Sequence, residues 1–193
     1  GAMYRAMALY FLRRGIDRRD EKAIEAACPE ITISLRYEEA VQKVLLNGED
    51  VSGLIRTEEV SAMTSAVSVY AAVRRTLLEL QRELARTRNV IMDGRDIGTC
   101  VLPGAQTKIY LTASTRVRAA RRFKELEEKG EMCNLEEIEQ DIIERDYRDM
   151  HREIAPLKQA EDAVLIESSD MAIDQVVEAI VEAARKRGLE EDR

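Results

Sequence analysis

A short charged loop near the middle of the chain has the residue types of a ligand-binding loop. Residues 93–98 read DGRDIG and follow an apolar segment that is typical of a buried strand. Open α/β sheets bind ligands at the carboxyl ends of their strands, which is where these charges are expected. The two glycines allow the tight backbone path that such a loop needs. The alternative is a solvated loop whose charged side chains pair with one another.

A second charged run, residues 144–152, reads ERDYRDMHR. At about 100° per residue, a helix places four of its side chains within roughly one 100° arc: Arg145, Arg148, Asp149 and Arg152. Guanidinium groups match phosphate oxygens two at a time, so this face suits a polyphosphate. The alternative is a solvated helix with i,i+4 ion pairs between Arg145 and Asp149 and between Glu144 and Arg148.

Other arginines stand alone in the sequence, with no obligatory partner nearby: Arg5, Arg56, Arg74 and Arg75. Singly, each is typical of a surface residue. The basic stretch at residues 116–122 continues into glutamates, which indicates a solvated helix with patterned charge.

Composition limits the class of protein. The chain has 193 residues, enough for one compact domain with a small insertion. Its net charge of −7 argues against nonspecific binding to DNA or to an anionic membrane, so an anion site must be local. The six tyrosines, two phenylalanines and absent tryptophan offer little for stacking on nucleobases.

The remaining reactive residue types suggest no further site. Three cysteines (Cys28, Cys100 and Cys133) lie far apart and form no CxxC pair, which indicates neither a disulfide framework nor structural zinc and fits a reducing cytoplasm. His151 is the single histidine, and no GxSxG motif accompanies it. No apolar run is long enough to span a membrane.

The elements that must position these residues alternate between helix and strand. Helices are predicted up to Gly15 (with Met3, Met7, Tyr10 and Phe11 on one face), over residues 20–27, over 57–86 with a break near Tyr70, and from an Asn134 cap to Met150. An antiparallel segment with an Asn47-Gly48 turn is predicted within residues 30–56. Short apolar strands are predicted at residues 89–94, 107–112 and 163–167. This order favours an α/β fold with a parallel sheet.

Four blocks of the sequence, in the same order, resemble bacterial cytidylate kinases. They are GAMYR at residues 1–5, NGEDVSGLIRT at 47–57, DGRDIGT at 93–99 and ERDYRD at 144–149, with APL at 155–157 and AEDA at 160–163. The resemblance covers essentially the whole chain, and it is more specific than any one block.

The resemblance implies a P-loop nucleoside-monophosphate kinase fold, with a parallel sheet core flanked by helices. It implies a core at residues 1–29 and 57–122, a small antiparallel CMP-binding insertion at 30–56, a short helical lid at 123–155, and a last strand and helix at 156–193. The implied partners are CMP, dCMP and ATP, with Mg²⁺ as cofactor, in a cytoplasmic monomer that binds neither nucleic acid nor membrane.

The implied reaction converts ATP and CMP or dCMP to ADP and CDP or dCDP. Carried over position by position, the CMP phosphate contacts Arg5, Arg95 and Arg152, the cytosine contacts Ser65, Arg74 and Asp96, and the ribose contacts Arg145 and Asp149. The arginines expected to act in catalysis are Arg95, Arg145 and Arg152. Asp93 is a looser transfer, as a carboxylate near Mg²⁺, directly or through water.

One feature of the family is missing from this sequence. No GxxxxGK[ST] phosphate-binding loop occurs in it, although the family begins with a strand, this loop and a helix. The loop's backbone N–H groups and lysine would bind the ATP phosphates. We therefore expect the chain as printed to turn over negligibly, and the natural protein to extend N-terminally beyond Gly1.

Two alternatives come from other classes of protein. The first is a catalytically silent module that binds CMP without an ATP loop. The second is a protein that binds RNA through its basic helix faces.

Overall fold

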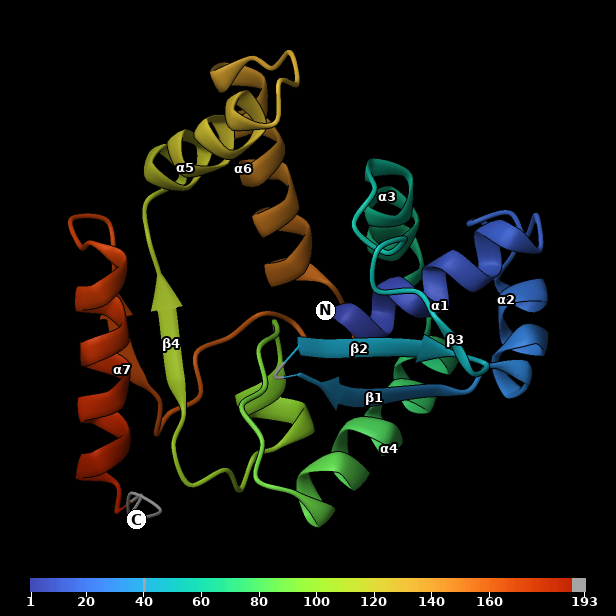
Figure 1. Cartoon of the computed structure of the whole chain (residues 1–193), viewed down its shortest axis with the longest axis horizontal. Helices are drawn as coiled ribbons and strands as arrows, with labels where there is room; N and C mark the ends of the chain where they lie inside the picture. The colour runs from blue at the N-terminus through green and yellow to red at the C-terminus, as the bar shows by residue number, and fades with distance from the viewer. Residues whose placement is uncertain (40, 189–193) are drawn as a thin grey trace. The chain divides into compact units, whose positions relative to one another are not determined.

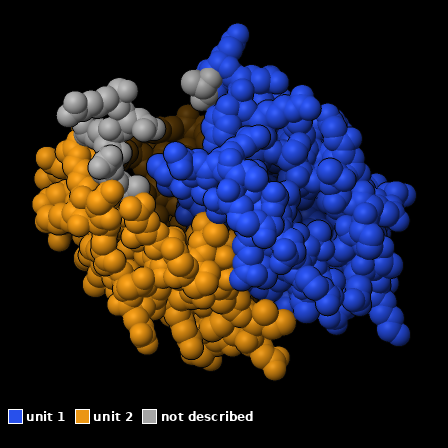
Figure 2. Space-filling view, turned by 90° about the horizontal axis from the view of Figure 1, so that it is seen from below, with its two compact units in different colours: residues 1–94 blue, residues 95–193 orange. Residues whose placement is uncertain are grey.

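The computed structural model describes residues 1–39 and 41–188. The chain divides into two compact units, residues 1–94 and 95–193, which are coloured separately in Figure 2. Figure 1 labels most of their helices and strands. The boundary falls inside the charged loop at residues 93–98, so the candidate site residues are divided between the units.

Unit 1 combines four helices with a small antiparallel sheet among its described residues. The helices are α1 (Ala2–Arg13), α2 (Glu21–Ala27), α3 (Glu58–Val67) and α4 (Ala71–Thr87), with a 3₁₀ turn η1 (Cys28–Glu30). The strands are β1 (Ile33–Glu38), β2 (Val41–Leu46) and β3 (Glu49–Asp50), paired in that order. The predicted helices and the break near Tyr70 are confirmed, and so is the antiparallel character of residues 30–56.

Local signals set the ends of these elements. Asp20 and Thr57 accept hydrogen bonds from backbone N–H groups in the first turns of α2 and α3. Gly15, just beyond α1, has φ +65°, which favours glycine because no Cβ has to be accommodated. Asn47 and Gly48 have φ values of +49° and +88°, as a two-residue hairpin turn between β2 and β3 requires.

One continuous hydrophobic core lies in unit 1. The predicted face of α1 is confirmed, because Met3, Met7, Tyr10 and Phe11 are all buried. Against them pack residues of every other helix and of the sheet: Ile24, Ile33, Val44, Leu46, Val60, Met63, Val67, Val73 and Leu77. This packing fixes the two helices, α3 and α4, that carry Ser65 and Arg74.

The strand predicted at residues 89–94 is wrong. These residues form an irregular segment after α4, and the side chains of Val90 and Ile91 are exposed. A strand forms only where a neighbour accepts and donates its backbone hydrogen bonds, and no described strand pairs with this segment. An apolar run alone does not supply that partner. Asp93 therefore does not lie at a strand end.

Unit 2 contains a parallel pair of strands, β4 (Ile109–Thr112) and β5 (Val164–Glu167). Both were predicted, and their parallel pairing is confirmed. Helices α5 (Thr115–Glu128) and α6 (Leu135–His151) connect them, α7 (Ile173–Lys186) follows β5, and a π-helical turn η2 (Ile97–Val101) precedes β4. Asn134 caps α6 by accepting from the N–H groups of Glu136 and Glu137, as predicted.

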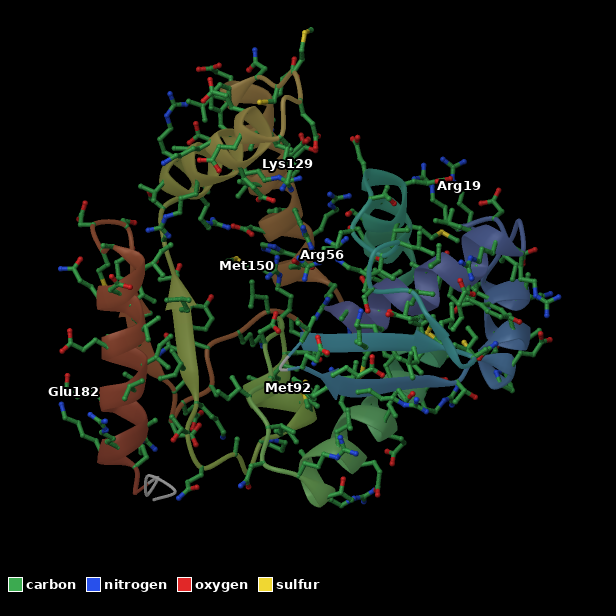
Figure 3. All side chains as sticks on the ribbon, viewed as in Figure 1. Arg19, Arg56, Met92, Lys129, Met150 and Glu182 are labelled. Atoms are coloured by element: carbon green, nitrogen blue, oxygen red, sulfur yellow. The ribbon has the colours of Figure 1, made fainter. Side chains whose placement is uncertain are left out.

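Charged side chains cover the helices of unit 2. Figure 3 shows them along α5, α6 and α7, with Lys129 and Glu182 among those labelled. Ion pairs to Lys129 and Arg122 lower the pKa of Glu125 to about 2. The prediction of a charge-patterned, solvated helix at α5 is thus confirmed. No described helix is long and apolar enough to cross a membrane.

Hydrogen bonds of Ser52 connect β2 to the residues that follow β3 in unit 1. Ser52 donates its hydroxyl and its backbone N–H to Asp50 Oδ1, at 2.5 and 3.0 Å, and its Oγ accepts from the Val44 N–H at 2.9 Å. These bonds from Ser52, with the Lys43 ammonium, lower the pKa of Asp50 to about 2. The ionised carboxylate therefore stabilises the hairpin.

We predict that Asp50→Asn lowers the stability of the protein at pH 7 and does so less at pH 3. The folded pKa of Asp50, about 2, lies below its ordinary value of 3.8, so its contribution is full above that ordinary value and falls as the pH drops toward 2. Urea unfolding followed by circular dichroism at both pH values measures the difference. The exposed Glu38→Gln on β1 is the control, and an Asp50→Asn effect independent of pH would contradict the prediction.

Candidate functional site

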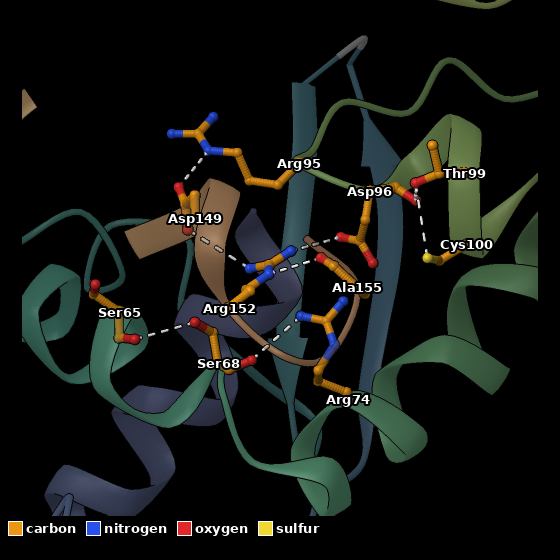
Figure 4. A network of polar contacts seen from close by, with 10 residues as sticks. All are labelled: Ser65, Ser68, Arg74, Arg95, Asp96, Thr99, Cys100, Asp149, Arg152 and Ala155. Atoms are coloured by element: carbon orange, nitrogen blue, oxygen red, sulfur yellow. Dashed lines mark hydrogen bonds and ion pairs between the residues drawn. The ribbon is translucent and has the colours of Figure 1, made fainter. Parts of the chain in front are cut away.

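Four charged side chains in unit 2 form a chain of ion pairs that alternates in sign. Arg95 donates from Nε to Asp149 Oδ2 at 2.8 Å, and Arg152 Nη1 lies 3.6 Å from Asp149 Oδ1. Arg152 also donates from Nη2 to Asp96 Oδ1 at 3.4 Å. Figure 4 shows this ion-pair chain, which runs Arg95, Asp149, Arg152, Asp96. It joins the two charged motifs of the sequence, the 93–98 loop and the 144–152 run.

The ion-pair chain is most buried at its Arg152–Asp96 end. The exposed fractions are 9% for the Arg152 side chain, 11% for Asp96, 17% for Asp149 and 43% for Arg95. Partial burial strengthens the attraction between opposite charges, and it makes an unpaired charge costly. The charge of each buried arginine or carboxylate is therefore stabilised by its neighbours in the ion-pair chain.

Backbone geometry fixes both carboxylates. Asp96 precedes the turn η2, and its carbonyl accepts from the N–H groups of Cys100 at 2.9 Å and Val101 at 3.2 Å. π-Helical turns are rare, and they are often found at functional sites. Asp149 lies in the last turn of α6, three residues before Arg152, and this spacing places the two on one face of the helix.

The predicted arc on α6 is confirmed for Asp149 and Arg152, which contact each other. Asp149 also pairs with Arg95, from a distant part of the sequence, so this face is more than a helix surface with i,i+4 pairs. Arg145 and Arg148 are exposed on the same helix.

Two candidate residues of unit 1, Ser65 and Arg74, are linked through Ser68, as Figure 4 shows. Arg74, 8% exposed, donates from Nη1 to the Ser68 carbonyl at 3.2 Å. The Ser68 hydroxyl in turn donates to the Ser65 carbonyl at 3.1 Å. Ser68 therefore links the two residues that were predicted to contact a base.

Arg5 lies on α1 and contacts the segment that leads into α3. Its Nη1 donates to the Ile55 carbonyl at 3.1 Å and to Ser61 Oγ at 2.7 Å. These bonds orient the guanidinium by anchoring it to the start of the helix that carries Ser65.

Several residues of these networks were not predicted, among them Ser68 and Ala155. Ser68 lies at the predicted break between α3 and α4, where a residue must leave the helix, and that break was the available signal. Ala155 accepts from Arg152 Nε at 2.7 Å through its carbonyl. A backbone acceptor of this kind leaves no signal in residue type.

Two other reactive side chains, Cys28 and His151, have structural roles. Cys28 is buried, and burial raises the pKa of its thiol, so the nucleophilic thiolate is disfavoured. His151 binds the Tyr147 carbonyl at 2.8 Å and stacks on the Tyr147 ring, with 4.1 Å between centroids. Asp93 is exposed, and the described residues contain no group of three or more side chains that could hold a metal ion.

The arrangement in unit 2 suits the recognition of a phosphate group. Guanidinium groups donate two hydrogen bonds at once to phosphate oxygens, and the carboxylates hold the arginines in fixed orientations before a ligand arrives. Such an arrangement can position a phosphate group and stabilise its negative charge.

Comparison with known proteins gives one consistent family. The family model described as "Cytidylate kinase" matches residues 1–186. A cytidylate kinase of Lactobacillus johnsonii is 49% identical over 187 residues, which cover 97% of this chain and 81% of that protein. Cytidylate kinases of Bacillus licheniformis (45% identity, covering 97% and 83%) and Citrifermentans bemidjiense (44%, covering 100% and 83%) are also similar.

We predict that Asp149→Asn destabilises the protein by about 1–2 kcal/mol, because it leaves Arg95 and Arg152 without a shared counter-charge. Asp141→Asn, on the exposed surface of the same helix, is the control and should change the free energy of unfolding by less than about 0.5 kcal/mol. Urea unfolding followed by circular dichroism measures both. Equal effects of the two substitutions would show that the ion-pair chain does not contribute to stability.

Proposed function

Since the chain belongs to the cytidylate kinase family, we propose that it transfers the γ-phosphoryl group of ATP to CMP or dCMP and so forms ADP and CDP or dCDP. The observation that carries the proposal is the ion-pair chain of Arg95, Asp149, Arg152 and Asp96. It joins two of the four sequence blocks that resemble the family, residues 93–99 and 144–149, and it presents guanidinium groups held by carboxylates.

Phosphoryl transfer asks a protein mainly to position two substrates and to stabilise the charge of the moving phosphoryl group. We assign Arg5, Arg95 and Arg152 to the phosphate of CMP. Arg95, Arg145 and Arg152 would also stabilise negative charge during transfer, and no covalent intermediate on the protein is required. Because carboxylates already orient Arg152, little reorganisation is needed when the phosphate binds.

Cytosine would be recognised through its exocyclic amino group. A carboxylate can accept several hydrogen bonds at once, so Asp96 can accept from this amino group as well as from Arg152. Ser65 and Arg74 would donate to the acceptor atoms of the ring. Uracil carries an oxygen in place of the amino group, and that oxygen would oppose the Asp96 carboxylate.

Arg145 and Asp149 are assigned to the ribose. Asp149 is 17% exposed, and both of its oxygens already bind arginines. A ribose hydroxyl would add one more donor to this carboxylate, which links recognition of the sugar to the position of Arg152.

Mg²⁺ would accompany ATP rather than occupy a preformed protein site. Magnesium is commonly bound through one or two carboxylates together with substrate phosphates. Asp93, an exposed carboxylate beside the ion-pair residues in sequence, fits the role of one such ligand, directly or through water. The ion would neutralise charge on the ATP phosphates. The printed sequence contains no GxxxxGK[ST] motif, so we assign no residue to those phosphates.

Several predictions from the sequence remain predictions. They are the division into a core, a CMP-binding insertion at residues 30–56 and a lid at 123–155, the monomeric state, the cytoplasmic location, and the absence of nucleic acid and membrane partners. The antiparallel strands β1–β3 fall within the proposed insertion, and α6 lies within the proposed lid. The matched relatives are named kinases, so they do not favour a module that binds CMP silently.

Two measurements test the proposal. Calorimetric titration compares the binding of CMP, dCMP, UMP and AMP, and a coupled assay measures ADP formation with each. We expect CMP and dCMP to bind most tightly. In a full-length chain that carries a GxxxxGK[ST] phosphate-binding loop, both should support ADP formation, whereas the chain as printed should turn over negligibly. Binding of CMP without turnover by the full-length chain would favour the silent module, and a steep salt dependence of RNA affinity without any effect of CMP would favour an RNA-binding protein.

We predict that Arg152→Ala weakens CMP binding by about 2 kcal/mol, roughly thirtyfold, because a charge-assisted contact to the phosphate is lost. Arg187→Ala is the control: Arg187 donates to the Asp162 carbonyl and is not assigned to the substrate. Calorimetric titration of both variants measures the difference. Equal affinities in the two variants would remove Arg152 from the site.

A further inference from the structure

The backbone of Ala155 adopts an unusual conformation. Its φ is +48°, in the left-handed region that residues with a Cβ rarely occupy. The other described non-glycine residues with positive φ are Glu39 and Asn47, and Asn47 belongs to a hairpin turn that demands it. Alanine, in contrast, has no polar side chain that could stabilise this region.

Pro156, the next residue, makes the conformation of Ala155 less favourable still. A residue before proline is normally pushed to extended backbone, with φ near −120°. Left-handed residues of this kind persist where the surrounding structure enforces them, and they cluster at functional sites. The contacts of this turn must therefore enforce the left-handed conformation of Ala155.

The turn after α6 folds back onto the last turn of that helix. The Leu157 N–H donates to the Asp149 carbonyl at 2.8 Å, while the Ala155 carbonyl accepts from Arg152 Nε at 2.7 Å. Between these two bonds lies Ala155, which reverses the direction of the chain. The reversal brings the Ala155 carbonyl to the side chain of a residue only three positions earlier.

This carbonyl completes the enclosure of the Arg152 guanidinium. As Figure 4 shows, Nε faces Ala155, Nη1 faces Asp149 and Nη2 faces Asp96. The carboxylates attract the charge from two sides, but their distances of 3.6 and 3.4 Å are long. The bond to the Ala155 carbonyl is the shortest of the three, so it does most to fix the plane of the guanidinium.

We propose that Ala155 is a positioning residue for Arg152, whose guanidinium plane is set by the carbonyl that the left-handed backbone presents. The proposal rests on the proposed function, in which Arg152 contacts the phosphate of CMP. It adds a residue outside the charged motifs that orients the phosphate-binding arginine through its backbone carbonyl.

Substitutions that differ in their tolerance of left-handed backbone test this role. Ala155→Val introduces a β-branched residue that disfavours positive φ. Ala155→Asn introduces a side chain similar in size to that of valine, but asparagine tolerates positive φ. We expect Ala155→Val to weaken CMP binding about tenfold in calorimetric titration, and Ala155→Asn and Ala155→Gly to bind like the parent protein. Similar affinities of the Val and Asn variants would overturn the proposal.

A double substitution separates positioning from general damage to the fold. If Ala155 acts through Arg152, adding Ala155→Val to the Arg152→Ala protein should not weaken CMP binding further. A further tenfold loss in that background would show that the turn acts by another route and would overturn the proposal. Circular dichroism melting of each variant confirms that binding is compared between folded proteins.

A measurement on the unmodified protein needs neither CMP nor a variant. NMR exchange of the arginine Nε–H protons should show slower exchange for Arg152 than for Arg187, which donates to the Asp162 carbonyl from Nη2 instead. Equal exchange rates would overturn the Ala155 contact even if Ala155→Val failed to fold. Slow exchange at Arg152 together with no binding of CMP would leave the positioning contact standing and contradict the proposed function.

Discussion

Two arginines and two carboxylates that neutralise one another hold the candidate site of unit 2 together. Arg152 is almost fully withdrawn from solvent, and a charge in that position is tolerated only beside opposite charges and hydrogen-bond acceptors. Asp149 and Asp96 supply those charges, and the Ala155 carbonyl supplies a third acceptor. The end of α6, the turn that follows it and the 95–96 segment are therefore mutually dependent, because each provides a partner that another needs.

The same pairing shows how the proposed phosphate site could form in an acidic protein. The net charge of −7 repels anions at long range, but screening by salt confines that effect to about 10 Å. At contact distance the geometry of a few guanidinium groups decides the outcome. In the proposed reaction the carboxylates that hold the arginines also meet the substrate, Asp96 at the base and Asp149 at the sugar. Recognition of the nucleoside and orientation of the phosphate ligand are then properties of one network.

Unit 1 positions its residues in a different way. Its candidates, Arg5, Ser65 and Arg74, lie on helices that share a continuous apolar core. Arg5 donates to the Ile55 carbonyl and the Ser61 hydroxyl, and Arg74 donates to the Ser68 carbonyl. Packing fixes the helices, and hydrogen bonds between them and their neighbouring segments then orient the side chains. In unit 2 the described buried apolar residues are few and mostly small, so ion pairs carry more of the positioning.

The sequence by itself determined the elements with strong local signals: the helices with their caps, the Asn47-Gly48 turn, the break near Tyr70 and the strands β4 and β5. It also identified the charged residues, because arginine and carboxylate spacing shows the shared face of α6. Tertiary structure decided the rest. Residues 89–94 have the composition of a strand yet form none, since a strand requires a partner that local sequence does not specify. Arg95 pairs with Asp149, 54 positions away in the sequence, and the Ala155 carbonyl accepts from Arg152. Both contacts depend on the path of the folded backbone, which the residue types alone do not specify.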